Sequence, residues 1–559
     1  MNDKFNFLDS SEISKNRIIK ILLFTAIVCF LIFLILLSSV PPTARDALIH
    51  HLALPKLWLM QGKFLHIPWA EFSYYPMNIE LLYSIPLYFH NDIIPSYIHL
   101  LFGCCTGLLI YLHLRVKIGE LWGLLGGLIF ISTPIIIRLT TTAYIDLGMT
   151  FFLTGSLLAF IKWRETQFKG GKWFYCSSLC MGLALGSKYN ALIAFFFLTM
   201  IVAFIYARDT GRQWKALKYG IIFCAISLLF ALPWYMMNYV TTGNPIYPLF
   251  DGLFRAYDNA SDFKGQILNS IRDNATHGLF QTRFLNYGEG FWETVLIPLR
   301  IFFQGRDNSP QYFDGVLNPI LIVFLLFSFI NQQFRKEAVL FSIFAGFFII
   351  VAFFTEAIRT RYILPVVPFL VIMCVYGMRN LLSLEWNRSF PLQHISKITV
   401  YSVLILCLAM NAIYLKNYFK SVDPMPYILN HETRDQYLSR HLGNYQSIKY
   451  VNDNLSDDSC VRFIFMGRRG YYLDRPYIHD RNFGMSVIDE MVKASVDGNS
   501  LKGYFKRQNY SHLMIRMDLF EQYLMNNFSE LQISKFARSF NNDTFLLYEA
   551  NGYAVYKIE

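Results

Sequence analysis

The sequence predicts an all-α domain that crosses a membrane many times, followed by a small α/β domain at the C-terminus. The composition is the first reason: 54% of the 559 residues are hydrophobic, and only 16% are charged. A water-soluble protein carries about 25% charged residues. The second reason is that apolar stretches of about 20 residues, long enough to cross a bilayer as helices, recur along most of the chain. The mean hydropathy of +0.34 agrees with a polytopic membrane protein.

The apolar stretches predict eleven membrane-spanning helices. They are expected near residues 18–40, 93–114, 119–137, 143–161, 173–187, 189–206, 217–236, 317–333, 337–354, 362–378 and 397–415. Alternate loops, such as "KWRETQFKGGK" and "NQQFRKE", are short and basic, which is typical of cytoplasmic loops. The N-terminus is therefore expected inside the cell, and an odd number of spans places the C-terminus outside. The first span is followed by a poor signal-peptide cleavage site, so we expect it to remain as an uncleaved membrane anchor.

The loops divide the chain unequally between the two sides of the membrane. Large segments at 41–92, 237–316 and 420–559 are all expected on the outer face. In the last of these, short strand patterns and an Asn551-Gly552 turn typical of tight hairpins predict a small α/β domain. The expected domains are a cytoplasmic N-terminus (1–17), a transmembrane domain (18–415) and an outer C-terminal domain (420–559).

Charge and cysteine usage exclude several classes of function. The formal net charge is +11, but the basic residues are spread along short loops and form no nucleic-acid-binding stripe. Eight of the nine Cys lie in apolar segments, so neither a disulfide framework nor a zinc site is expected. No cluster of ligands requires a metal. We therefore expect no cofactor, while dependence on a divalent cation stays open.

Asp46 is the first candidate for a catalytic carboxylate. It ends "TARD", a capping pattern in which Thr43 is the N-cap. Asp46 and His50 are four residues apart, so they are expected on one face of a helix that lies in the membrane interface. Asp46 is thus either a capping acid or a carboxylate held beside lipid headgroups. His50 is typical of a polar helix face and is also a candidate for lining a substrate site.

Two further acids occupy similar positions. Glu80 lies in the first turns of a second interfacial helix, which is expected to begin at Pro76, and Asp146 lies in the first turn of the fourth span. Both positions complement a helix dipole. An acid so close to hydrocarbon is nevertheless costly unless it faces a cavity or a partner. Glu80 and Asp146 are therefore candidates for a structural role and for a catalytic role.

Three cations lie at expected outer ends of spans. Lys188 is at the junction of the fifth and sixth spans, and Arg359 and Arg361 are on the shortest outer loop. Snorkelling along the apolar surface explains such residues simply. Lys and Arg are usually enriched in cytoplasmic loops, so cations on the outer side call for another explanation. They also suit a phosphate-bearing lipid ligand. Tyr247 belongs to a belt of aromatic residues whose main expected role is structural. It is also a candidate for lining a substrate site.

Several short motifs resemble those of bacterial glycosyltransferases of the GT-C fold, near the protein O-mannosyltransferases and the lipid A aminoarabinose transferase. The motifs are "RDALIHHLALPKLW", "AYIDLGMTFF", "GSKYNAL", "PWYMMNY" with "TGNPIYP", and "RYILPVVPFL", which together span about residues 20 to 380. The resemblance implies a polyprenyl-phosphate-linked sugar donor, a catalytic Asp46, a second acid at Asp146 and a phosphate-binding Lys188. The mannosyltransferases have an Asp-Glu pair where Asp46 is followed by Ala47. This departure leaves the acceptor and the role of the second acid open.

These observations favour a glycosyltransferase on the outer face of a bacterial inner membrane. A hexose or pentose would pass from a polyprenyl phosphate to a hydroxyl of a lipid, glycan or protein acceptor. Asp46, with Asp146 and Glu80 as further candidates, would supply the base, and Lys188, Arg359 and Arg361 would hold the donor phosphate. One alternative is a transporter or flippase-like protein for envelope glycolipids, which needs charges or broken helices near the midplane. Another is a non-catalytic envelope assembly protein, which would tolerate loss of the loop carboxylates.

Overall fold

The computed structural model describes residues 10–64, 66–252, 254, 278–354, 358–383, 390–480, 482–497, 501–508 and 510–558. The chain forms two compact units. Unit 1 comprises residues 1–39, 75–79 and 95–424, and unit 2 comprises residues 40–74, 80–94 and 425–559. Each unit is described by itself.

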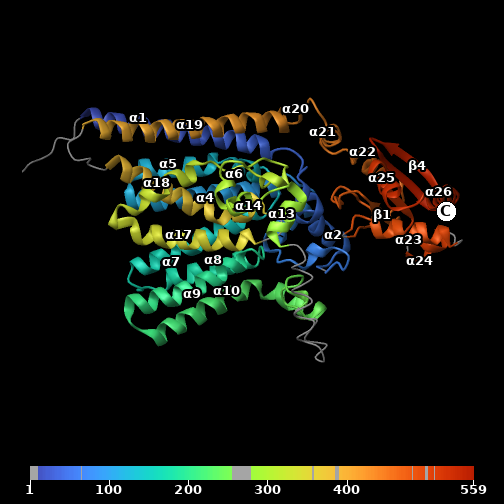
Figure 1. Cartoon of the computed structure of the whole chain (residues 1–559), viewed down its shortest axis with the longest axis horizontal. Coiled ribbons are helices and arrows are strands. Elements are labelled where there is room, and N and C mark those ends of the chain that lie inside the picture. The colour runs from blue at the N-terminus through green and yellow to red at the C-terminus, as the bar shows by residue number, and fades with distance from the viewer. Residues whose placement is uncertain are drawn as a thin grey trace, which may run out of the picture. The chain divides into compact units, whose positions relative to one another are not determined.

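Unit 1 is built from helices, in which α denotes an α-helix and η a 3-10 or π-helix (Figure 1). Its first helices are α1 (Ser10–Ser38), α4 (Ile94–Ile118), α5 (Glu120–Ser132), α6 (Pro134–Thr140), α7 (Asp146–Glu165), α8 (Lys172–Leu185), α9 (Ala191–Thr210) and α10 (Gln213–Thr242). The second large loop, between α10 and α16, contains α13 (Leu279–Tyr287), α14 (Phe291–Val295), α15 (Ile297–Arg300) and η3 (Pro310–Tyr312). The remaining helices are α16 (Ile320–Val323), η4 (Leu325–Phe329), α17 (Gln332–Phe353), η5 (Thr360–Val366), α18 (Val367–Ser383) and α19 (Phe390–Val422).

Seven helices in the described part of the chain are long and apolar enough to cross a membrane, and a bent pair raises the number to eight. The seven lie at Asn16–Ser38, Ile94–Ile118, Ala191–Thr210, Gln213–Thr242, Gln332–Phe353, Thr360–Ser383 and Ile395–Val422. The bent pair is α5 and α6, which meet at 67°. Pro134 begins α6 and explains the break, because a proline cannot continue the hydrogen-bond ladder of α5. The chain is therefore a multi-pass membrane protein, as the sequence predicted.

The structure does not confirm the count of eleven spans. The fourth, fifth and eighth expected spans coincide with α7, α8 and the apolar segment Ile320–Phe329, none of which is among the seven. With 14 residues, α8 is about 21 Å long, less than the roughly 30 Å of a hydrocarbon core. A short helix can still lie at membrane depth when neighbouring helices cover its ends.

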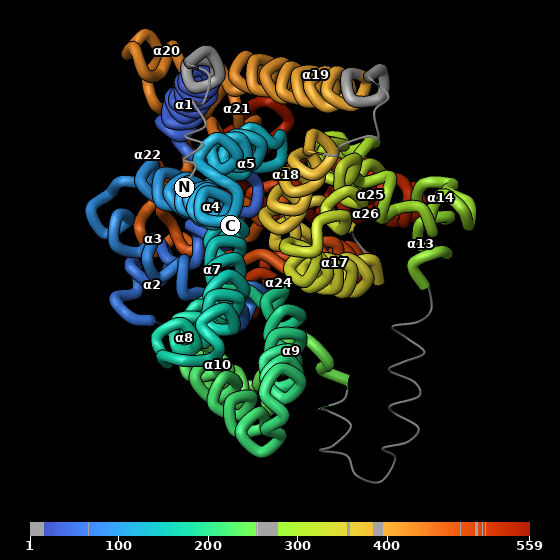
Figure 2. The backbone as a smooth tube through the Cα atoms, turned by 90° about the vertical axis from the view of Figure 1, so that its left-hand side faces the viewer, coloured from blue at the N-terminus to red at the C-terminus, as the bar shows by residue number. Residues whose placement is uncertain are grey.

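Helix α18 is the centre of the bundle. It forms most of the candidate span Thr360–Ser383. In the most apolar part of this span 89% of the residues are buried, against 17–39% in the other six candidate spans. Helix α18 packs against α5, α16, α17, α19 and η4, and Figure 2 shows α5, α17 and α19 around it. Gly377 permits the closest approach, because a Cβ there would lie 2.0 Å from the carbonyl oxygen of Phe324. A second group packs α8 against α7 and α10, and α9 against α10.

Unit 2 combines the first large loop (residues 40–74 and 80–94) with the C-terminal residues. The loop forms η1 (Ala47–His51), α2 (Ala53–Gln61), η2 (Glu71–Tyr74) and most of α3 (Asn78–Tyr88). The C-terminal helices are α20 (Met425–Ile428), α21 (Arg434–His441), α22 (Tyr445–Asn454), α23 (Met485–Val496), α24 (Leu501–Gln508), α25 (Met517–Asn527) and α26 (Glu530–Asp543). The strands are β1 (Val461–Ile464), β2 (Tyr477–Ile478), β3 (His512–Arg516), β4 (Thr544–Ala550) and β5 (Tyr553–Ile558).

The five strands form one mixed sheet in the order β2-β1-β3-β5-β4. β1 is parallel to β2 and β3, whereas β5 is antiparallel to β3 and β4. The hairpin between β4 and β5 turns at Asn551 and Gly552, both with positive φ. This is the geometry that an Asn-Gly pair favours. The predicted α/β domain and its hairpin are thus confirmed.

Contacts within unit 2 tie the first loop to the C-terminal residues. Lys56 of α2 donates hydrogen bonds to the carbonyl oxygens of Tyr471 (2.7 Å) and Leu473 (3.0 Å) and to the carboxylate of Asp474 (2.6 Å). Burial lowers the pKa of Lys56, and the attraction of Asp474 offsets only part of that effect. The amine is thus committed to three acceptors that come from one short stretch of the C-terminal domain.

Candidate functional site

Asp146 and Lys188, two candidates from different motifs, form an ion pair. Asp146 begins α7, and Lys188 lies in the turn between α8 and α9, so the packing of these helices brings them together. The Lys188 amine lies 2.6 Å from Oδ1 of Asp146. Asp146 is fully buried, whereas the Lys188 side chain is 15% exposed. Lys188 is therefore the member of the pair that a ligand can reach.

Arg361 and two tyrosines complete this group. The Arg361 guanidinium lies 5.5 Å from the ring centres of both Tyr144 and Tyr362. The Lys188 amine is 5.7 Å from the Tyr362 ring, so the two cations share one aromatic neighbour. Arg361 also lies close enough to Asp146 to act on its charge. We call these five residues the Lys188 cluster; it contains two positive charges and one negative charge.

The turn that carries Lys188 depends on a glycine. The N–H of Asn78 donates to the carbonyl oxygen of Gly186 (2.8 Å), and the Trp234 indole donates to Oδ1 of Asn78 (2.8 Å). A Cβ at position 186 would lie 1.9 Å from Nδ2 of Asn78. The motifs "GSKYNAL" and "PWYMMNY" therefore meet around Asn78, and only glycine fits without displacing it.

His99 fixes the first turn of α7 on the other side of the pair. The N–H of Leu147 donates to Nε2 of His99 (3.0 Å), so Nδ1 carries the proton and donates to the carbonyl oxygen of Leu139 (2.8 Å). His99 is fully buried. Neither His99 nor Asn78 was predicted from the sequence. A histidine inside an expected span was the available signal for His99, because a polar side chain at that depth is costly without a partner.

Tyr247 contributes to the site through its backbone. The Tyr189 hydroxyl, one residue beyond Lys188, donates to the carbonyl oxygen of Tyr247 (2.8 Å) and accepts from the Asn238 amide (2.9 Å). Tyr75 packs on Tyr189, with 5.2 Å between ring centres. The start of the second large loop is thereby tied to the Lys188 turn. This contact indicates a positioning role for the backbone at Tyr247.

The structure does not bring Arg359 into the Lys188 cluster. Its guanidinium faces Asp314 at 3.9 Å, and Arg138 binds the same carboxylate at 3.0 Å. Arg138 also pairs with Asp307 at 3.0 Å. Arg359 therefore belongs to a charge network of the second large loop. Of the two arginines predicted to hold phosphate, only Arg361 lies with Lys188.

Asp46 precedes an irregular turn in unit 2. η1 is a π-turn, in which the N–H of Leu52 donates to the carbonyl oxygen of Ala47 (2.9 Å), and the Asp46 side chain makes no capping hydrogen bond to it. Asp46 is half-buried. The regular helix expected after Thr43 is thus interrupted by a π-turn that follows Asp46 and contains His50. π-Turns often occur at functional sites.

Glu80 and His50 are held inside the same unit. Oε1 of Glu80 lies 2.7 Å from Nδ1 of His51, and both side chains are almost completely buried. The His50 ring stacks on Phe72, with 4.1 Å between centres and 17° between planes. Glu80 therefore pins the π-turn to α3. His50 therefore packs against Phe72 in the buried part of the loop.

Unit 2 also contains a cavity of about 930 Å³ between the first loop and the C-terminal residues. Its walls carry aromatic and charged side chains, including Tyr88, Asp92, Arg434, Tyr472 and Asp474. Arg434 and Asp92 form an ion pair. Aromatic rings beside paired polar groups suit a hydroxyl-rich molecule. Among the described residues, no group of three or more His, Cys, Asp or Glu is arranged to hold a metal ion.

Comparisons with known proteins agree with this architecture. Residues 70–244 match the family model of the dolichyl-phosphate-mannose-protein mannosyltransferases. The whole structure is similar to ArnT from Cupriavidus metallidurans bound to undecaprenyl phosphate, with a TM-score of 0.57, 13% identity, and coverage of 96% of this chain and 97% of that one. The chain has the GT-C fold.

A second structure supports the same conclusion about the fold. The apo oligosaccharyltransferase of Archaeoglobus fulgidus matches with a TM-score of 0.50 and 14% identity, covering 96% of this chain and 74% of that one. Curated protein sequences gave no significant match. The GT-C resemblance predicted from the motifs is confirmed. The family match includes Asp146 and Lys188 and excludes Asp46 and Arg361.

Proposed function

We propose that this GT-C protein is a membrane glycosyltransferase that uses a polyprenyl-phosphate-linked sugar. The observation that carries the proposal is the Lys188 cluster, in which Asp146 holds Lys188 beside Arg361 at the ends of membrane helices. Such cations form strong hydrogen bonds to a phosphate. The family match over residues 70–244 and the ArnT structure with bound undecaprenyl phosphate support the same donor class.

In the proposed reaction, an acceptor hydroxyl attacks the anomeric carbon of the donor sugar. The new C–O bond forms as the bond to the phosphate oxygen breaks, and polyprenyl phosphate leaves with its negative charge. Attack opposite the leaving group inverts the anomeric configuration. Lys188 and Arg361 stabilise the charge that develops on the phosphate. Asp46 accepts the hydroxyl proton, a step that contributes about 10² to 10⁴ in rate.

Asp146 has a positioning role in this scheme. Its carboxylate is fully buried and bonded to Lys188, so it orients the amine and does not face the acceptor. Arg359 ranks behind Arg361 as a phosphate ligand, because Asp314 already faces it. The sugar and the acceptor, which is a lipid, glycan or protein hydroxyl, are left open by these residues.

Donor binding gives the direct test. The purified chain should bind undecaprenyl phosphate, and Lys188→Gln and Arg361→Gln should each weaken binding by about tenfold or more, since a charged hydrogen bond contributes about 1.5–3 kcal/mol. Lys336→Gln is a matched control, because Lys336 is an exposed cation on α17 outside the cluster. Equal affinities in all variants would reject the phosphate role. Release of undecaprenyl phosphate from a panel of undecaprenyl-phosphate hexoses and pentoses then identifies the sugar.

The proposal also requires the site to lie on the outer face of a bacterial inner membrane. The basic loops between alternate helices support an inside N-terminus and an outside C-terminal domain. A reporter active only in the periplasm should work when fused after Glu559 and fail when inserted in "KWRETQFKGGK". The reverse pattern would place the candidate site in the cytoplasm and reject the proposed donor arrangement.

A further inference from the structure

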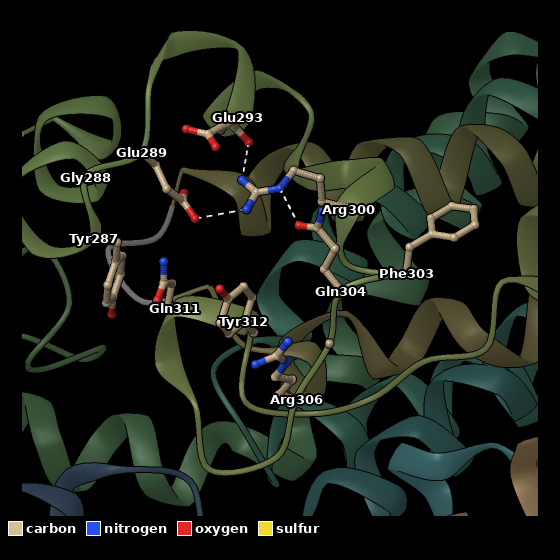
Figure 3. Close-up of a pocket in the computed structure, with 11 residues that line it drawn as sticks. Tyr287, Gly288, Glu289, Glu293, Arg300, Phe303, Gln304, Arg306, Gln311 and Tyr312 are labelled. Atoms are coloured by element: carbon tan, nitrogen blue, oxygen red, sulfur yellow. Dashed lines mark hydrogen bonds and ion pairs between the residues drawn. The ribbon is translucent and has the colours of Figure 1, made fainter.

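The second large loop contains a polar pocket of about 440 Å³ that shares no residue with the Lys188 cluster (Figure 3). Its lining includes Glu289, Glu293, Arg300, Phe303, Arg306 and Tyr312. Figure 3 shows Arg306 beside Tyr312, on the opposite side of the pocket from Glu293. The pocket therefore places a cation and a ring together at one wall.

Glu289, a carboxylate that lines the pocket, is bound by two arginines. Arg283 donates two hydrogen bonds of 2.7 Å to the carboxylate of Glu289, and Arg300 donates a third at 3.0 Å. Burial raises the pKa of Glu289, but these hydrogen bonds and charges outweigh that effect and hold the pKa below its ordinary value. Glu289 is thus ionised and fully engaged. Glu293, the other carboxylate in the lining, accepts a hydrogen bond from the N–H of Gly290 at 2.8 Å and lies across the pocket from Arg306 (Figure 3).

Arg306 is a positioned cation that is not neutralised. Its guanidinium stacks over Tyr312, 4.6 Å from the ring centre, and within the described part of the chain it makes no hydrogen bond or ion pair. The backbone holds it in place, because its N–H donates to the carbonyl oxygen of Tyr312 (3.0 Å) and its own carbonyl accepts from Gly315 (3.1 Å). The neighbouring Asp307 carboxylate is bound by Arg138 and Tyr414. The donors of Arg306 are therefore available to an anion.

An apolar face borders this pocket. On α13 to α15 and just beyond them, large apolar side chains are 54–70% exposed: Phe284, Leu285, Phe291, Trp292, Leu299 and Phe303. Phe280 of α13 stacks on Phe291 and lies 6.4 Å from Phe353, the last residue of the candidate span α17. Figures 1 and 2 both show α13 and α14 beside α17. Aromatic residues at the end of a spanning helix are typical of the membrane interface.

We propose that this pocket binds the phosphate of a membrane lipid, with Arg306 as its principal ligand. The planar guanidinium matches phosphate geometry, and the pocket of about 440 Å³ gives it room for a headgroup. Phe303 lines the pocket and also belongs to the exposed apolar face. The acyl chains would lie along this face, so the site selects a lipid phosphate over free phosphate. The site is independent of the sugar-transfer proposal.

The test measures binding by the full chain in a nonionic detergent. The probes are dihexanoyl phosphatidic acid, dihexanoyl phosphatidylcholine and inorganic phosphate. Phosphatidic acid should bind best, and Arg306→Gln should weaken it by about tenfold or more. The control is Arg335→Gln, which removes an exposed arginine at the other end of α17 and should leave binding unchanged. Because Arg306 is exposed, its loss removes no core contact.

Two further variants separate the sources of the phosphate. Phe303→Ser should reduce affinity for phosphatidic acid while leaving any affinity for inorganic phosphate unchanged. Equal binding of inorganic phosphate and phosphatidic acid would overturn the lipid assignment. Lys188→Gln should not alter phosphatidic acid binding. If Lys188→Gln abolishes it and Arg306→Gln does not, the lipid phosphate binds at the Lys188 cluster and the proposal for this pocket fails.

Discussion

The pair of Asp146 and Lys188 makes the sharpest prediction about the candidate site. At 2.6 Å the two charges attract by about 6 kcal/mol at an effective dielectric constant of about 20, before the cost of desolvation is subtracted. Removing one member of a buried pair costs about 3–5 kcal/mol, because the other charge is stranded. Lys188 is 15% exposed and Asp146 is not exposed. Lys188→Gln should therefore destabilise the protein more than Asp146→Asn, which leaves a cation that water can still reach.

The double variant separates pairing from ligand binding. If the two residues stabilise each other, the double variant should be more stable than the sum of the single effects predicts, with a coupling energy of about 1–3 kcal/mol. Donor binding should follow a different order. Asp146→Asn keeps the Lys188 charge but removes the carboxylate that orients it, so undecaprenyl phosphate binding should weaken. Lys188→Gln and the double variant, which remove the charge itself, should lose binding.

The assay combines the thermal unfolding midpoint of the purified chain with its affinity for undecaprenyl phosphate. The wild-type protein is the reference, and Lys336→Gln, which changes an exposed cation outside the cluster, is the control. Strictly additive stability effects would show that the two residues do not act as a pair. Unchanged donor binding in Asp146→Asn, with Lys188 intact and the protein folded, would refute the positioning role assigned to Asp146.

Three other predictions test separate parts of the structure. Asp46→Asn should reduce sugar transfer by at least about a hundredfold while donor binding persists, and near-normal transfer would remove Asp46 as the base. Gly186→Ala should weaken donor binding, because its Cβ would lie 1.9 Å from Nδ2 of Asn78 and displace the Lys188 turn; Gly346→Ala, which meets no atom within 4 Å, is the control. The pKa of Glu289 is depressed from its ordinary value of 4.5, so its contribution to stability is present above pH 4.5 and is lost as acid titrates it at lower pH. Glu289→Gln should remove that part of the acid-induced fall in the unfolding midpoint, and an unchanged acid profile would contradict the pairing with Arg283.

Regular features of the fold were predictable because they depend on local pattern. Long apolar runs gave the spanning helices, and the Asn551-Gly552 turn gave the hairpin between β4 and β5. The break between α5 and α6 was missed, although Pro134 inside the expected third span was a signal. β2 was also missed. A strand of two residues is too short to show the alternation of polar and apolar residues that predicts a strand. It forms because its backbone pairs with the edge of β1.

The candidate site was predictable as a set of residues but not as a set of contacts. Asp146 and Lys188 were each chosen for their position at a helix end, and only the packing of α7 against α8 shows that they are partners. Arg359 and Arg361 could not be ranked from the sequence. Arg359 has an extended backbone before η5, whereas Arg361 lies inside that helix, and the two side chains reach different neighbours.

The three candidate carboxylates can now be ordered by what a general base requires. A base must reach the acceptor hydroxyl and must be able to take its proton. Asp146 is fully buried and bonded to Lys188, and Glu80 is 1% exposed and bonded to His51, so both are occupied in holding the structure. Asp46 is half-buried, so solvent reaches it, and it precedes a π-turn that interrupts the loop helix. A regular helix could place Asp46 by its own hydrogen bonds. The π-turn instead needs Glu80 and His51 to hold it, which makes the position of Asp46 depend on that buried pair and explains why two acids in one loop have different tasks.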